Sequence, residues 1–197
     1  MKLVKTYHPN GKLREQYYEL NDKHHGEYKC WHPNGQLCIH TYYVNGKTHG
    51  EYKMWYDNGQ LNIHTYYVNG KTHGEYKQWH NNRKLYIHTH YEHGQHHGEY
   101  KWWYENGQLH VHTYYVNGKH HGEYKMWYPN GELYLHTNYE HGQYHGEYKE
   151  WNKQGNLINH SFWLNDKEVT NEVDKLVTNR YNITQEERTL IKLAVGC

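Results

Sequence analysis

The chain has 197 residues, a formal net charge of +1, 24 tyrosines and 8 tryptophans, but one phenylalanine. A charge this close to zero excludes a strong overall field for nucleic acid, and no apolar run reaches the ~20 residues of a membrane span. Tyrosine and tryptophan keep a polar edge in water, so the composition favours an open sheet over a two-layer core. Residues 1–5 lack the pattern of a signal peptide, and we expect a soluble, cytoplasmic protein.

A 24-residue repeat organises the chain. Residues 44–53 and 68–77 have the same sequence, VNGKTHGEYK. One aromatic position recurs at the same step, at Tyr7, Trp31, Trp55, Trp79, Trp103, Trp127 and Trp151. This period is typical of a repeat architecture, and it predicts seven units within a repeat array over residues 1–168.

Two sets of turns divide each unit. Asn-Gly pairs occur at residues 10–11, 34–35, 58–59, 106–107 and 130–131, and a second set at 45–46, 69–70 and 117–118. Asn-Gly between short aromatic or branched runs is the strongest local hairpin signal. We therefore predict an all-β repeat protein, an elongated antiparallel meander of about 14 strands and roughly 65 Å. Arg83 occupies a turn glycine position, which predicts strain or a different turn there.

Two-residue loops fix a register. Around Asn58-Gly59 they predict one apolar face, with Tyr52, Met54, Tyr56, Leu61, Ile63, Thr65 and Tyr67, and one mixed face, with Glu51, Lys53, Trp55, Asn62, His64 and Tyr66. The same register places Cys30 and Cys38 on opposite faces, which predicts no disulfide between them.

The repeat ends near residue 168. A capping-box sequence at residues 184–187 precedes an apolar stripe at 188–195, and residues 171–181 form a weaker helical pattern. Terminal units of repeat arrays need a cover, so we predict a C-terminal helical cap over residues 169–197.

The unit resembles the MORN repeat (membrane occupation and recognition nexus), in the 24-residue variant also found in bacterial antitoxin-like proteins. Tyr42, Tyr43, Gly46, Gly50, Tyr52, Trp55, Gly59 and Leu61 carry the resemblance, and their equivalents recur over residues 7–164. The resemblance implies a meander of β-hairpins. The near-identical units also resemble expanded repeat families of large DNA viruses, which implies a viral protein in host cytoplasm or virion.

No catalytic or cofactor site is expected. His40, His64, His88, His112, His136 and His160 recur on alternate strands, about 9–10 Å apart, too far for one metal ion. Every Glu-Tyr-Lys triplet recurs in equivalent surroundings, whereas an active site is a single asymmetric place. The lysine of each Glu-Tyr-Lys triplet follows a glutamate by two residues, which cancels the field that drives nucleic-acid binding. We expect a non-enzyme with neither metal nor cofactor.

The remaining hypothesis is a repeat scaffold that binds a protein partner or its own copy, in the second case as a homodimer. Tyrosine and tryptophan dominate interface hot spots, so the candidate surface consists of Trp31, Trp55, Trp79, Trp103, Trp127, Tyr42, Tyr66 and Tyr114. The resemblance implies two alternatives, a phosphoinositide or membrane-associated adaptor and an antitoxin-like neutralising protein. The 22 histidines predict destabilisation or loss of self-association as the pH falls through about 6.

Overall fold

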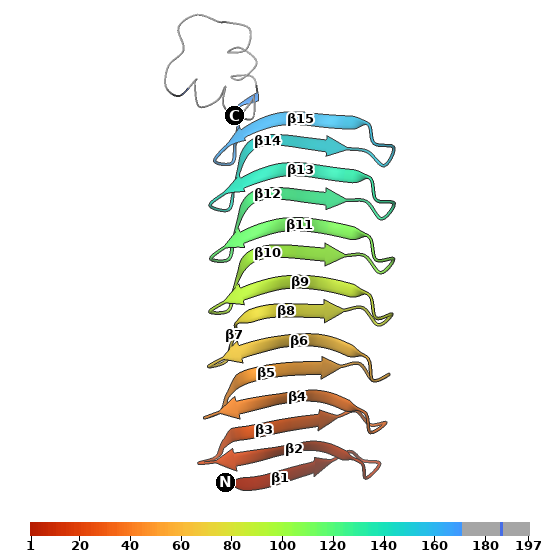
Figure 1. Cartoon of the computed structure of the whole chain (residues 1–197), viewed down its shortest axis with the longest axis vertical. Helices are drawn as coiled ribbons and strands as arrows, with labels where there is room; N and C mark the ends of the chain where they lie inside the picture. Colours follow the sequence, from red (N-terminus) through yellow and green to blue (C-terminus); the bar gives the residue numbers. More distant parts are fainter. Residues whose placement is uncertain (171–185, 187–197) are drawn as a thin grey trace, which may run out of the picture. The chain divides into compact units, whose positions relative to one another are not determined.

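The computed structural model describes residues 1–170 and residue 186. Sixteen strands within these residues form an open antiparallel meander whose order follows the chain (Figure 1). Contacts divide the chain into two compact units, residues 1–98 with 105–107, and residues 99–104 with 108 onward. We describe each unit by itself.

The first unit holds β1 to β9. Its strands are Lys2–Tyr7 (β1), Leu13–Leu20 (β2), Lys23–Trp31 (β3), Leu37–Val44 (β4), Lys47–Trp55 (β5), Leu61–Val68 (β6), Lys71–Thr72 (β7), Gly74–Trp79 (β8) and Leu85–Glu92 (β9). Gln95–Trp103 (β10) has residues in both units. The second unit continues with Leu109–Val116 (β11), Lys119–Trp127 (β12), Leu133–Glu140 (β13), Gln143–Trp151 (β14), Leu157–Leu164 (β15) and Lys167–Glu168 (β16).

The predicted all-β meander is confirmed, with a different strand count among the described residues. One predicted strand is divided at His73 into β7 and β8, and the short β16 is additional. The ten residues that include this break are identical to those of the unbroken β5 region, so the break is not a property of that segment alone. The helices predicted at 171–181 and 184–195 lie outside the described residues, and the boundary at residue 168 stays a prediction.

The two sets of turns differ in type, and within each unit they lie at opposite ends of the strands (Figure 1). At Asn45-Gly46 both residues have positive φ, 52° and 79°, and Val44 pairs with Lys47. This is the predicted two-residue loop of a type I′ turn. At Asn58-Gly59 only the glycine has positive φ, and Tyr56 N–H donates to Gln60 O at 2.9 Å. This loop has three residues, with a type I turn and a glycine bulge.

The longer loop corrects part of the predicted register. Trp55 pairs with Leu61, whereas Met54 pairs with Ile63, so Asn62 is an extra residue on β6. The extra residue restores the predicted pairs beyond it, Lys53 with His64 and Tyr52 with Thr65. Leu61 therefore lies with Trp55 on the mixed face, and its predicted place on the apolar face is wrong.

Asn62 and its equivalents lie on the apolar face instead of the mixed face. The ring of His110, at the Asn62 position of its repeat, lies 4.3 Å from Trp102 and stacks at 4.1 Å on Tyr104. The same shift brings Cys38 beside Cys30, which contradicts their predicted placement on opposite faces. Burial and the hydrogen-bonded Cys38 thiol raise the pKa of Cys30 to about 12.

A second bulge lies at the His-Gly-Glu sequences of β3, β5, β12 and β14. Thr41 pairs with Tyr52 and Tyr43 with Thr48, so His49, Gly50 and Glu51 together oppose Tyr42. Gly50 has φ +86°, a conformation that glycine adopts without steric cost. Thr41 is 1 % exposed, and its hydroxyl donates to Glu51 O at 3.1 Å, which satisfies a carbonyl freed by the bulge. Thr65 makes the same bond to Glu75 O at 3.1 Å, so the buried threonine supports the bulge in these two repeats.

The apolar face is a ladder of aromatic pairs over the buried threonines. Tyr52 and Tyr67 meet edge to face at 5.5 Å, and Tyr124 and Tyr139 do so at 5.7 Å in the second unit. Burial raises the pKa of Tyr52 and of Tyr124 to about 12. Val111 and Leu135 are buried on the same face, so this ladder and these two side chains form an apolar core on one side of the sheet.

Side chains near the turns connect each repeat to the next. The Tyr56 hydroxyl donates to Trp79 O at 2.8 Å, and the imidazole of His32 bonds Trp55 O at 2.9 Å. Either tyrosine or histidine occupies this position from His8 to Tyr128, because both offer a polar atom of similar reach. The turn asparagines act similarly, since Asn82 Nδ2 donates to Glu105 O at 2.9 Å while its Oδ1 accepts from Lys84 N–H at 3.0 Å.

Arg83 keeps the turn of its repeat but adopts the left-handed conformation. Its φ is +69°, and Arg83 N–H donates to His80 O at 3.0 Å, as Gly59 N–H does to Tyr56 O. The prediction of a different turn is therefore wrong. The unfavourable feature at Arg83 is its positive φ, because a residue with a Cβ adopts this conformation at a steric cost.

We predict that Arg83→Gly raises the free energy of unfolding by about 1 kcal/mol, because glycine adopts this φ without the Cβ clash. Gly11→Ala is the matched control, since its φ is +82° and an added Cβ meets nothing within 4 Å. It should lower the free energy of unfolding by about the same amount. Urea unfolding measures both changes, and an unchanged Arg83→Gly midpoint would contradict the prediction.

Two histidines on the apolar face predict a pH dependence. Burial lowers the pKa of His96 and of His110 below the ordinary value of 6.5. A neutral imidazole in the folded state gives stability that is complete above the unfolded pKa and is lost as the pH falls from there through the lower folded pKa. His96→Thr with His110→Asn, residues found at Thr72 and Asn62, should weaken the fall in melting temperature between pH 7.5 and pH 5. An equal fall in wild type and variant would refute this assignment.

Candidate interaction surface

The mixed face carries a repeated cluster of one glutamate, one lysine and one histidine. Glu51 Oε1 lies 2.8 Å from Lys53 Nζ and 2.9 Å from His64 Nε2. Cross-strand pairing of Lys53 with His64 and the two-residue step from Glu51 to Lys53 bring the three together. The equivalent clusters are Glu27/Lys29/His40, Glu75/Lys77/His88, Glu99/Lys101/His112, Glu123/Lys125/His136 and Glu147/Lys149/His160.

Each glutamate is the shared acceptor of its cluster. The Lys53 hydrogen bond and then the His64 hydrogen bond lower the pKa of the Glu51 carboxyl below its ordinary value of 4.5. The side chains of Glu51 and Lys53 are about one-third exposed, so solvent weakens the attraction between them. Each cluster therefore holds its three side chains in place on the mixed face, and the glutamate neutralises the charge of its lysine.

The three predicted tyrosines are exposed on this face, as is Tyr7 at the Trp31 position of the first repeat. Tyr42 is 41 %, Tyr66 42 % and Tyr114 40 % exposed. The ring of His40 lies 5.4 Å from that of Tyr42, and the pair His112 and Tyr114 has 5.2 Å. Tyr42 and Tyr114 lie opposite His-Gly-Glu bulges, where three residues oppose one. The bulge thus leaves each ring accessible while the histidine supports one side.

A valine two residues beyond each tyrosine extends the exposed apolar area. Val44, Val68 and Val116 are 40–44 % exposed and share a face with Tyr42, Tyr66 and Tyr114 by strand alternation. The Tyr-Val pairs were not singled out from the sequence, although their recurrence at 24-residue steps was visible. Equivalent positions hold His90 and Glu92 in β9, and the half-buried Tyr18 with the exposed Leu20 in β2. The pairs of the first unit in which both apolar side chains are exposed therefore lie in β4 and β6.

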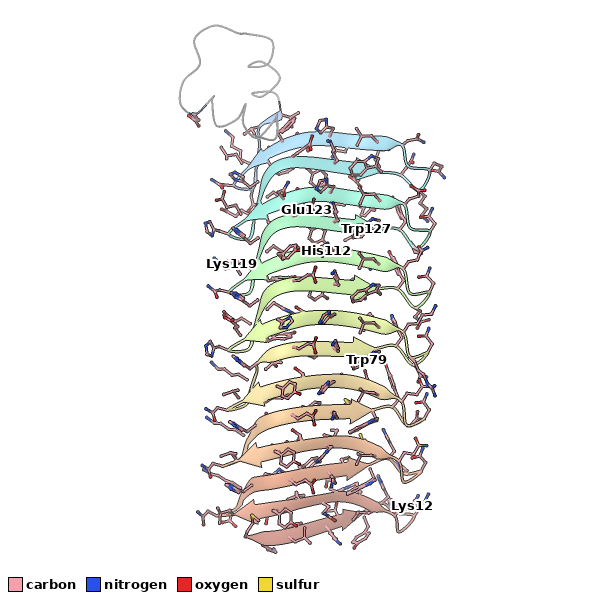
Figure 2. All side chains as sticks on the ribbon, viewed as in Figure 1. Lys12, Trp79, His112, Lys119, Glu123 and Trp127 are labelled. Carbon is pink, nitrogen blue, oxygen red and sulfur yellow. The ribbon has the colours of Figure 1, made fainter. Side chains whose placement is uncertain are left out.

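The five predicted tryptophans lie near the turn ends of their strands and are half-buried. Figure 2 shows Trp79 in the first unit and Trp127 in the second toward this end of β8 and β12, whereas Glu123 lies nearer mid-strand. Trp79 lines an open groove with Leu61, Gln60 and Arg83. The structure therefore separates the predicted set into exposed tyrosines toward the two-residue turns and half-buried tryptophans beside the three-residue turns.

The predicted histidine column lies on the same face. His64 bonds Glu51 of its own hairpin, rather than Glu75 of the following strand. Within residues 1–170 and residue 186, no three His, Cys, Asp or Glu side chains gather in a way that suits a metal ion. In that same part of the chain, no helix has the length and apolar character needed to cross a membrane.

The comparisons with known proteins agree with the repeat read from the sequence. The family model described as MORN repeat variant matches residues 2–19, 25–45, 48–69, 97–117 and 121–141, more than half of the chain. No curated protein matches the chain. Because five repeats match at the spacing that the β-hairpins follow, the chain belongs to the MORN repeat variant family.

Proposed function

We propose that the protein is a non-catalytic scaffold whose mixed face binds another protein. MORN repeats are consistent with a repeat scaffold for protein or membrane interaction. The observation that carries the narrower proposal is the exposed apolar pair Tyr42 and Val44 beside the equivalent pair Tyr66 and Val68. Exposed tyrosines on a rigid sheet bury a large area at little cost in side-chain entropy, as interface hot spots do.

The charged clusters support a protein partner over a phosphoinositide membrane. Lys29, Lys53, Lys77, Lys101, Lys125 and Lys149 each lie 2.7–2.8 Å from a glutamate oxygen. Recognition of anionic lipid uses clusters of lysine and arginine whose charge is available. Lysines already neutralised by glutamate suit a polar rim around an apolar centre, as in protein interfaces. No feature of the described residues favours the antitoxin alternative.

The repeat itself provides a gentle variant for the test. Tyr42→His, Val44→Glu, Tyr66→His and Val68→Glu together convert both apolar pairs into the pair that β9 carries as His90 and Glu92. The fold should persist, because these residues already occupy equivalent strand positions. The test cross-links each protein to its partners in cell extract and quantifies the cross-linked proteins by mass spectrometry. The yield of a protein that binds this face should be at least tenfold lower with the variant than with wild type.

His90→Tyr with Glu92→Val is the matched control, since it adds an apolar pair to β9 of the same unit. The same partners should be retained at equal or higher yield. An identical set of proteins at unchanged yield from wild type and the four-residue variant would contradict the proposal.

A further inference from the structure

At the edge of β15, residues are exposed that in earlier repeats are covered by the following strand. Leu157 is 49 % and Ile158 58 % exposed. Their equivalents in β13, Leu133 and Tyr134, are half-buried against the following strand β14. Within the described residues, only β16 and residues 169–170 follow β15, and they pair with its second half. The first half of the β15 edge is therefore unpaired in that part of the chain.

Backbone hydrogen bonds show which groups face this edge. Val169 N–H donates to Phe162 O at 2.7 Å, and Phe162 N–H donates to Thr170 Oγ1 at 3.0 Å. Successive residues of a strand direct their N–H and C=O groups to alternate sides. His160, two residues before Phe162, therefore directs its backbone donor and acceptor toward the open edge.

The edge of β1 is the complementary half of the same pattern. Lys5 and Tyr7 occupy the repeat positions of Lys29 and Trp31, and Leu3 that of Glu27. On β3 this side is paired with β2, where Gln16 opposes Lys29. On β1 no described strand lies there, and Leu3 and Tyr7 are 44 % and 58 % exposed.

The register between successive repeats defines which strand fits the β15 edge. The histidine of one hairpin opposes the lysine of the next strand in His40 with Lys53, His64 with Lys77, His112 with Lys125 and His136 with Lys149. His73 N–H donates to Tyr66 O at 2.8 Å, so His64 also directs its backbone groups to the following strand. The lysine of such a pair directs its own backbone N–H and C=O groups toward the strand that carries the histidine. Lys5 at this repeat position accordingly directs N–H and C=O away from β2.

We propose that the β1 edge of one copy pairs with the β15 edge of a second copy, with His160 opposite Lys5. The array register extends this to Ser161 opposite Val4 and Asn159 opposite Thr6. Strand addition supplies main-chain hydrogen bonds and covers Leu157 and Ile158. The interface is heterologous, so each dimer retains one free edge of each kind, and growth continues until a ring closes. The proposal involves the edges of the sheet and does not depend on the mixed face.

Proline at the paired positions tests the edges separately. Lys5→Pro and His160→Pro each remove an outward N–H and leave the internal hydrogen-bond ladder intact, as proline does on edge strands. Sedimentation velocity of the full chain should show a mass that rises with concentration for wild type and for Lys5→Ala. Each proline variant alone should remain a monomer. An equimolar mixture should form dimers and nothing larger, because it contains one competent edge of each kind.

Three results would overturn the proposal. Wild type could stay monomeric at every concentration, or Lys5→Pro could associate as wild type does. Alternatively, the His160 amide could be protected from hydrogen exchange equally at all concentrations, which would place another segment of the same chain on this edge. The variant that removes the Tyr42 and Tyr66 pairs should still associate through the edges, so the two proposals fail separately.

Discussion

The left-handed glycine of each His-Gly-Glu sequence is the constraint on which the sheet depends. A regular hairpin of this length would place Tyr42 directly against one residue of β5, but three residues oppose it. Gly50 at φ +86° absorbs the extra chain, and the buried Thr41 hydroxyl satisfies the freed Glu51 carbonyl. The β5 residues on either side of the bulge can then both pair with β4, Thr48 with Tyr43 and Tyr52 with Thr41.

The bulges also explain how a single sheet supports two different surfaces. The extra residue at Asn62 sends that side chain to the tyrosine ladder and leaves Leu61 beside Trp55. The His-Gly-Glu bulge leaves Tyr42 exposed while Glu51 reaches Lys53 and His64. One face is therefore an aromatic core with few charges, and the other is an ordered polar surface with exposed apolar pairs. The two faces continue from repeat to repeat, although β9 carries His90 and Glu92 at the positions of Tyr42 and Val44.

The sequence predicted those parts of the fold that depend on period and turn chemistry. The 24-residue step defined the hairpins, and Asn45-Gly46 predicted a type I′ turn correctly. Asn58-Gly59 has the same two residues but a different loop, because the chain after it contains a bulge that adds a residue. Alternation alone cannot locate such a residue, which is why the faces of Leu61, Asn62 and Cys38 were predicted wrongly. Tyr42, Tyr66 and Tyr114 were predicted as surface residues from composition, whereas their valine neighbours and the glutamate–histidine bonds depend on the bulges.

The most direct test of this account is the cost of removing one bulge glycine. Gly50→Ala adds a Cβ that meets nothing within 4 Å, so any effect reports the backbone conformation alone. Native-state hydrogen exchange should show that the opening free energy of the β4–β5 hairpin falls by about 1–2 kcal/mol, and by less for Gly50→Asn. The unaltered β11–β12 hairpin serves as the internal reference. Equal protection of the β4–β5 hairpin in wild type and both variants would contradict the central role given to the left-handed glycine.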